Sequence, residues 1–465
     1  MGLTVTNINT LSLLNIVNRT SAAQSNTLQR LSTGSKINKG SDDPAGLIAS
    51  RSLQTELAAV NAAVSNNQRT DSLLNVADKA LTEVSGLLEE VKSLALESAN
   101  TDGISADELA ANQAQIDEAI AAIDRIIGTT EFNGKKLLDG SLKIQTSGVD
   151  GTKISDLKVF GRNPDDDEAI TVTLNSAATR AVDTLATTSA STATSVSIQG
   201  KDGTVVIDVA SNENLSSVEA KIDAASAQTG VEAFVSSNTL YLQASDYGSS
   251  AFVRSTILSG DTTNFQEASA EGTDADVSIN GQAAAVDGLS VSYSANGVSF
   301  SFNLTEDYND GTVTGAESFT IDDAGGATFQ LGTSSTTRST VGLDGLFSQQ
   351  LGSAVTGYLS TLKGGGANSL LSDPNQAAQI ASEAAEQIAK VQGRIGGFQK
   401  FQVQTALNQQ NATKESLTSA LSVIKDVDYA TETAELNRQN VLLQSSISLL
   451  GLANQQSSQI LQLLG

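Results

Sequence analysis

The chain has 465 residues, which is long enough for two to four domains. Its net charge of −25 disfavours nucleic acid and anionic membrane surfaces as partners, because both select clusters of Lys and Arg. Cys, His and Trp are absent, which excludes disulfides, Cys/His zinc sites, thiol nucleophiles and a Ser-His-Asp triad. We therefore expect no enzyme activity and no cofactor. No run of about 18 apolar residues is present, so we also expect no membrane insertion.

The N-terminal part, residues 1–140, has the periodicity of helices. A first stripe at heptad spacing, with Ser21 and Gln24 as its polar members, consists of Leu14, Val17, Leu28 and Leu31. A second stripe predicts one long helix over about 44–100. A capping box at 105–108 opens a third helix, which we expect to end near Gly128.

A short ionic segment, KINKGSDDPAG (36–46), separates the first two helical patterns. It lacks the spacing of a phosphate-binding loop and no strand precedes it. Asp43 followed by Pro44 predicts the N-cap and first position of the second helix, and the charge of Asp42 also favours a helix N-terminus. We expect Gly34 and Gly40 to permit the backbone turns.

The middle of the chain, 141–365, alternates apolar and polar residues with period two, which predicts β-strands. Asp202-Gly203 and Asn296-Gly297 predict hairpin turns. Ser216 to Glu219 predicts the start of a short helix that runs to about Gln228. This zone holds 27 acidic and 10 basic residues, so we expect a β domain with an acidic surface.

The C-terminal part is helical again. Asp373-Pro374 predicts an N-cap and first helical position. The last forty residues carry a heptad seam, interrupted by Asn440, Asn454 and Ser457, that consists of Leu436, Leu443, Ile447, Leu450, Leu461 and Leu464. So polar a seam is too weak to hold a helix alone, which indicates either a soluble helical bundle or terminal helices that order when subunits associate.

Few segments are candidates for chemistry. Residues 306–317 place acidic side chains at several positions of a calcium loop, but Tyr308 occupies a ligand position. The acidic run 165–168 lacks the glycine and the twelfth-position acid of such a loop. No carboxylate pair is marked for acid–base work. We interpret these segments as loops and expect no metal site.

Both ends of the chain resemble bacterial flagellin, the subunit of the flagellar filament. The N-terminal motifs are LQRLSTGSKINKGSDDPAGLIASR, LALESAN and IDRIIGTTEFNGKKLLDG, and the C-terminal motifs are QIAKVQGRIGGFQKFQ, VIKDVDYATETAEL and LANQQSSQILQLL. A segment at about 193–245 is similar to the βα module inserted in flagellins and hook-associated proteins. The motifs cover about 1–140 and 366–465.

The resemblance implies a multidomain α + β fold, with an antiparallel helical core from both termini and an inserted β-rich outer domain. Residues 1–43 with 421–465 would form the inner coiled coil. Residues 44–140 with 328–420 would form a helical bundle with a β-hairpin that starts at Phe132–Gly134, and 141–327 the acidic outer domains.

The resemblance also implies function and partners. The chain would polymerise with itself into a filament after export, unfolded, by the flagellar type III route. Its partners would be an export chaperone, the filament cap and hook–filament junction proteins. The seam residues of both ends would bury their side chains on assembly. Lys36 and Lys39 would face acidic neighbours in adjacent subunits, beside Asp42, Asp43 and Pro44.

One stretch departs from the family pattern. Where members seen by the innate-immune flagellin receptor carry a basic residue, this chain has Glu89 and Glu90, close to Leu94. We therefore predict weak recognition by that receptor. Two rival interpretations are a hook–filament junction protein and a secreted glycan-binding adhesin or enzyme housed in the middle of the chain.

Overall fold

The computed structural model describes residues 8–100, 103–164, 166–353 and 356–464, and within these ranges the side chains of residues 10–455. The chain divides into two compact units, Met1–Ser65 with Ala406–Gly465 (unit 1) and Asn66–Thr405 (unit 2). Helices from the two ends of the chain flank a central region of antiparallel strands, which is the expected fold class. The domain boundaries expected from sequence stay a prediction.

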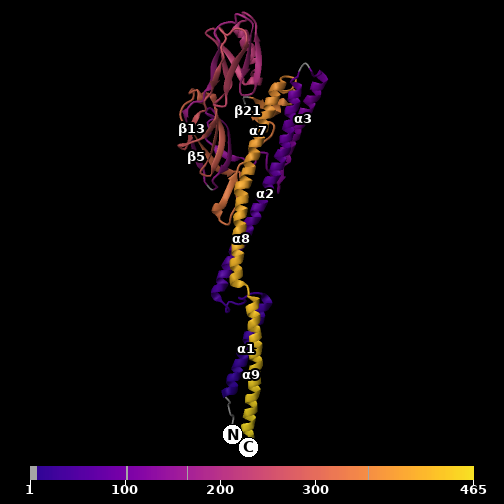
Figure 1. Ribbon diagram of the computed structural model, residues 1–465, viewed down its shortest axis with the longest axis vertical. Coiled ribbons are helices and arrows are strands. Elements are labelled where there is room, and N and C mark those ends of the chain that lie inside the picture. Colours follow the sequence, from indigo (N-terminus) through magenta and orange to yellow (C-terminus); the bar gives the residue numbers. More distant parts are fainter. Residues whose placement is uncertain (1–7, 101–102, 165, 354–355, 465) are drawn as a thin grey trace. The chain divides into compact units, whose positions relative to one another are not determined.

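The long helices follow the predicted patterns. Their bounds are α1 (Ile8–Thr33), α2 (Pro44–Ser98), α3 (Ala106–Thr129), α7 (Pro374–Phe398), α8 (Gln404–Lys425) and α9 (Tyr429–Leu464). A π-helical turn, Gln399–Val403, joins α7 to α8. In unit 1, α1 and α9 lie side by side and antiparallel (Figure 1).

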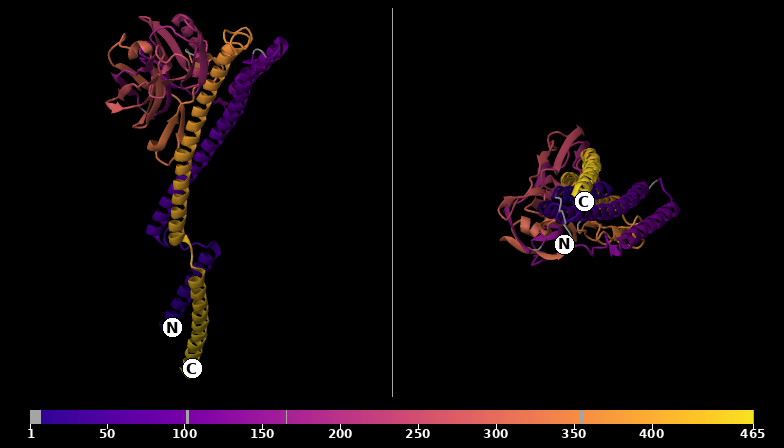
Figure 2. Two further views of the ribbon diagram at one scale, coloured as in Figure 1. Left: turned by 45° about the horizontal axis from the view of Figure 1, so that its top comes forward. Right: turned by 90° about the horizontal axis from the view of Figure 1, so that it is seen from below.

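The helices of unit 2 pack through the apolar stripes that the sequence predicts. The fully buried residues include Leu81, Leu88, Ile120, Ile123 and Ile388. Figures 1 and 2 show α3 turned back along the end of α2, where Asn112 donates a hydrogen bond to Ser98 (3.1 Å). Burial of each such Leu or Ile is worth about 1.5–3 kcal/mol, so these stripes hold the bundle together.

The helix ends confirm two predictions and correct one. Ser105 and Glu108 form the predicted capping box. Asp373 accepts hydrogen bonds from the backbone N–H groups of Asn375 and Gln376 (3.0 and 3.1 Å). Gly128, in contrast, lies inside α3, whose C-cap is Thr130 in an extended conformation. Because Thr130 ends the helix without a left-handed residue, no glycine is needed there.

A two-stranded hairpin, β1 (Glu131–Phe132) and β2 (Lys135–Lys136), follows α3. Asn133 and Gly134 both have positive φ (52° and 75°), as a two-residue type I′ turn requires. This confirms the hairpin expected at Phe132–Gly134. A second pair of short strands, β21 (Gly352–Ser353) and β22 (Gly357–Tyr358), lies before α7.

One β-sandwich forms the part of the middle region nearest to the helices in sequence. Its five-stranded sheet has the order β14-β13-β5-β18-β3 and its six-stranded sheet the order β15-β16-β17-β4-β20-β19. The strands are β3 (Ile144–Ser147), β4 (Ile154–Arg162), β5 (Glu168–Ser176), β13 (Asp276–Ile279), β14 (Gln282–Ala283), β15 (Ala285–Asp287), β16 (Ser290–Ala295), β17 (Val298–Leu304), β18 (Glu317–Gly325), β19 (Ala327–Gln330) and β20 (Arg338–Val341). Buried residues from both sheets, Phe300, Phe302 and Phe319 among them, form one core.

A second β region is inserted into this sandwich and has its own core. Its sheets have the orders β6-β10-β9 and β12-β11-β7-β8. Its elements are β6 (Arg180–Ala186), β7 (Thr194–Gln199), β8 (Thr204–Val209), α4 (Leu215–Asp223), α5 (Ser226–Thr229), β9 (Val231–Ser236), β10 (Thr239–Tyr247), β11 (Phe252–Ser259) and β12 (Ser269–Glu271). Helix α4 packs its buried face, which includes Val218 and Ile222, into this core.

Turn chemistry in the β region was predicted in part. Asn296 and Gly297 both have positive φ and join β16 to β17 as expected. Asp202-Gly203 belongs to a longer loop of four residues between β7 and β8. The predicted bounds of the helix from Ser216 to about Gln228 were wrong. It starts one residue after Asn214, whose side chain accepts from the Ser216 N–H (3.1 Å), and it stops at Asp223 before the separate α5.

Candidate assembly surface

The contact between α1 and α9 in unit 1 buries polar rather than apolar side chains. The buried residues of the two helices, within the part of the chain whose side chains are described, are Thr27, Gln439 and Ser446. Gln24 Nε2 donates to Asn440 Oδ1 (2.6 Å), and Arg30 lies 3.6 Å from Glu432. No described apolar side chain of these two helices is fully buried. One α1–α9 pair therefore has no hydrophobic core of its own.

The predicted seam residues take two kinds of position. Val17, Leu31, Leu436, Leu443 and Leu450 are half-buried. The side chains that remain exposed, at 45–54%, are Leu14, Leu28 and Ile447. Leu461 and Leu464 lie outside the residues whose side chains the structure describes. A two-helix contact covers only a narrow strip of each helix, so part of a broad apolar stripe stays uncovered.

Sequence analysis missed a second apolar stripe on α9. Val441, Leu442, Leu449 and Leu452 are exposed, with 67%, 45%, 50% and 54% of their surface accessible. Positions i, i+1, i+8 and i+11 fall on one side of an α-helix, because 3.6 residues make one turn. The spacing of these four residues is present in the sequence. The neighbouring leucines at heptad spacing matched the expected coiled coil, so only they were predicted as the seam. The four residues form the stripe we call the outer α9 stripe.

The segment between α1 and α2 is bound to the segment between α8 and α9. Lys36 N–H donates to the Lys425 carbonyl (2.6 Å), and Val427 N–H donates to the Gly34 carbonyl (3.1 Å). Both glycines lie at backbone turns, as expected: Gly34 has φ of +67°, in the left-handed region, and Gly40 lies in the turn that the Asp42 N–H closes on the Lys39 carbonyl (3.0 Å). Only Gly34 has the positive φ that favours glycine. Ile37 is buried beneath this loop.

The two aspartates of the loop have separate tasks. Asp43 Oδ1 accepts from the Gly46 N–H (2.9 Å), as an N-cap of α2 does, with Pro44 as first residue. Asp42 Oδ2 accepts from the N–H groups of Asn38 and Lys39 (2.9 and 2.8 Å), so it closes the loop instead of capping the helix. These backbone hydrogen bonds hold the pKa of Asp42 below its usual value.

The two lysines of the loop, Lys36 and Lys39, are exposed on unit 1. Glu89 and Glu90 are exposed on α2 within unit 2, and Leu94 is partly buried one turn further along. Lys92, between them, donates from Nζ to Ser382 Oγ (3.0 Å) on α7. The acidic pair is therefore accessible to a partner, while the nearest basic side chain is bound to a neighbouring helix.

The segments considered as candidate metal sites lie in ordinary elements of the fold. Residues 306–309 form α6 (Glu306–Asn309), and Tyr308 is buried in the sandwich core. Asp165 lies outside the described residues. The described residues contain no group of three acidic side chains arranged to hold a metal ion. No described helix is both long and apolar enough to cross a membrane.

Comparison with known proteins gives matches at both ends and in the middle. The bacterial flagellin N-terminal helical region matches residues 5–143, the C-terminal helical region matches 378–464, and the flagellin hook IN motif matches 195–246. The last range contains β8, α4, α5 and β9, and most of β7 and β10.

Individual relatives are similar over the whole chain or over its ends. Flagellin from Salmonella typhimurium is 28% identical over 505 aligned positions, which span 99% of each chain. B-type flagellin from Pseudomonas aeruginosa is 41% identical over 142 positions, which span 30% of this chain and 29% of that one. A solved structure of FliC from Burkholderia pseudomallei aligns with 72% of this chain and 99% of that chain, at 16% identity and a TM-score of 0.25. The chain therefore belongs to the bacterial flagellin family and is a structural subunit of the extracellular flagellar filament, not an enzyme.

Proposed function

We propose that the subunit joins the filament through α1 and α9, which complete their packing against the same helices of neighbouring subunits. One observation carries this proposal: the α1–α9 contact of unit 1 buries polar side chains and leaves leucines exposed on both helices. Apolar surface that is accessible in the free subunit supplies the driving force when it is removed from water. A heterologous contact between identical subunits that does not close builds a helical polymer.

The half-buried seam residues and the outer α9 stripe would serve different contacts. Leu436, Leu443 and Leu450 lie toward α1 of the same subunit. The outer α9 stripe is turned away from it and is free for a second copy. The loop lysines, Lys36 and Lys39, are exposed and would meet acidic side chains of an adjacent subunit.

Family membership supports a proposal for the route to the filament. We infer export in an unfolded state by the flagellar type III route, binding of an export chaperone near the C-terminus, and contacts with the filament cap and the hook–filament junction. The absence of Cys supports this, since no disulfide has to be broken before passage through a narrow channel.

Leu450→Asp tests the assignment of the terminal helices. A carboxylate at this half-buried position should keep α9 from packing in the filament, because an unpaired charge is costly to bury. We expect the variant to be exported with a folded β region and to form no filaments, as seen by electron microscopy. Gln444→Asp, at an exposed position of the same helix, is the matched control and should assemble. Normal filaments from Leu450→Asp would show that the assignment of Leu450 to the assembly seam is wrong.

A further inference from the structure

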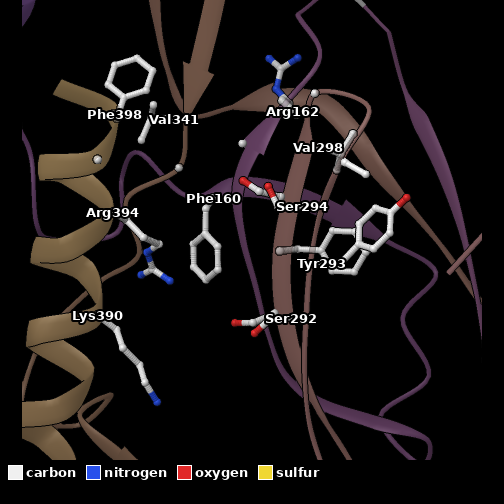
Figure 3. Close-up of a pocket in the computed structure, with 18 of the residues that line it drawn as sticks. Phe160, Arg162, Ser292, Tyr293, Ser294, Val298, Val341, Lys390, Arg394 and Phe398 are labelled. Atoms are coloured by element: carbon white, nitrogen blue, oxygen red, sulfur yellow. The ribbon is translucent and has the colours of Figure 1, made fainter. Parts of the chain in front are cut away.

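A cavity of about 1070 Å³ lies within unit 2, between α7 and the six-stranded sheet of the sandwich. Figure 3 shows Lys390 and Arg394 projecting from α7 toward the sheet, with Ser292 and Ser294 on the opposite wall. At one end the walls touch. The guanidinium carbon of Arg394 lies 3.3 Å from the ring centroid of Phe160, and the ring of Phe398 lies 5.8 Å from that of Phe329.

The sheet wall is lined by small polar side chains. Tyr293 and Phe300 of β16 and β17 point into the sandwich core, so the alternate residues of these strands face the cavity. Ser292 pairs in register with Ser301, and Ser294 with Ser299. These hydroxyl groups and the facing glycines of α7 are too small to fill the space between helix and sheet. The cavity is therefore open to another molecule.

Basic residues outnumber acidic ones in the lining of the cavity, the reverse of the chain as a whole. Three basic residues and a single acidic one, Asp344, line it, although the chain as a whole has 27 basic and 52 acidic residues. Two of the basic side chains have partners: Arg162 is paired with Asp323, and Lys390 with Glu386 at 2.8 Å. Arg394, the third, makes no hydrogen bond or ion pair with the described residues.

Arg394 lines the cavity and is half-buried. Burial lowers its pKa to about 10, and burial raises the pKa of Asp344, whose two carboxylate oxygens have no hydrogen-bond partner. Arg394 and Asp344 also attract each other electrostatically without a hydrogen bond, and the basic side chains of Lys143 and Lys158 act on Asp344 as well. A guanidinium with unused N–H donors, stacked on an aromatic ring, is well arranged to receive a carboxylate in a bidentate contact.

We propose that this cavity receives an acidic surface segment of a second copy of the chain, with a carboxylate of that segment bound to Arg394 in the filament. The inference rests on the proposed assembly through α1 and α9, which brings copies together. Residues 141–365 of every copy carry 27 acidic and 10 basic residues, so carboxylates are the groups a neighbour offers most. The cavity has room for several side chains, which fits a chain segment better than a single ion.

Cross-linking in filaments tests the proposal. Because the chain has no Cys, Ser292→Cys creates a single thiol that can carry a photoactivated benzophenone. Filaments are grown from equal amounts of normal and heavy-isotope subunits, irradiated and digested for mass spectrometry. We expect cross-links between light and heavy copies, to a peptide of 141–365 that contains Asp or Glu. Cross-links only within one copy, or to a segment without acidic residues, would overturn the proposal.

Arg394→Gln gives an independent readout. We expect at least a fivefold lower cross-link yield and a lower temperature of filament dissociation, while Lys79→Gln, an exposed lysine of α2, should match the parent. Circular dichroism of the monomers checks folding. If the parent forms no filaments, the proposed function fails. If filaments form without cross-links between copies, only the present inference fails. It also fails if a free sugar acid, glucuronate, saturates the monomer's cavity below millimolar concentration, because the cavity would then bind a small carboxylate and not a chain segment.

Discussion

Leu449→Ala tests how much the outer α9 stripe contributes to assembly. Truncation removes three carbon groups, which at about 0.8 kcal/mol each amount to about 2.4 kcal/mol for a side chain that becomes fully buried. Leu449 is 50% exposed in the subunit, so about half of this, roughly 1.2 kcal/mol, remains to be gained on assembly. Since 1.4 kcal/mol corresponds to a factor of ten, the critical concentration for polymerisation should rise about sevenfold.

The assay is seeded polymerisation of purified subunits, followed by sedimentation and measurement of the protein left in solution. The half of the Leu449 side chain that is already covered in the subunit contributes to the monomer's own stability, so the thermal unfolding of the monomer is measured in parallel. Gln444→Ala, exposed on the same helix but outside the stripe, should leave the critical concentration unchanged. A rise of less than about twofold for Leu449→Ala would refute the reasoning that the stripe is buried between subunits.

Three further predictions concern charged residues. Reversal of Lys36 and Lys39 to Glu should lower the temperature at which filaments dissociate, and unchanged dissociation would remove their proposed role. The folded-state pKa of Asp42 lies below its unfolded value, so its contribution to loop stability should persist above about pH 4 and be lost as pH falls through the folded pKa. NMR titration of Asp42 with hydrogen exchange of the loop amides measures this, and an Asp42 pKa at the unfolded value would contradict it. Purified monomer should activate the flagellin receptor weakly in a reporter-cell assay, and Glu90→Arg should increase activation. Strong activation by the parent would overturn that prediction.

The helices could be predicted from sequence because their stabilising contacts follow a local period. Leu81, Leu88, Ile120 and Ile123 recur at helical spacing, and each is fully buried. The hairpin at Asn296 could be predicted from local sequence as well, because a residue that tolerates positive φ favours a type I′ turn.

Sheet topology and the surfaces between elements could not be predicted in this way. Strand β5 pairs with β18 and β13, which lie more than a hundred residues further along the chain, and alternation does not specify a partner. The cavity depends on α7 lying across β16 and β17, so no local pattern around Arg394 or Ser292 identifies it. On α9, the sequence shows where the apolar residues are. It does not show that Leu450 faces α1 while Leu449 is exposed, because the packing of the two helices decides this.

The most direct test of the central claim is the accessibility of position 449 before and after assembly. Leu449→Cys provides the single thiol of an otherwise cysteine-free chain, and its rate of reaction with a soluble maleimide can be measured in monomers and in filaments. Assembly through the outer α9 stripe predicts rapid labelling of monomers and at least tenfold slower labelling of filaments. Equal rates in the two states would show that α9 does not bury this surface, and would contradict the proposed mode of assembly.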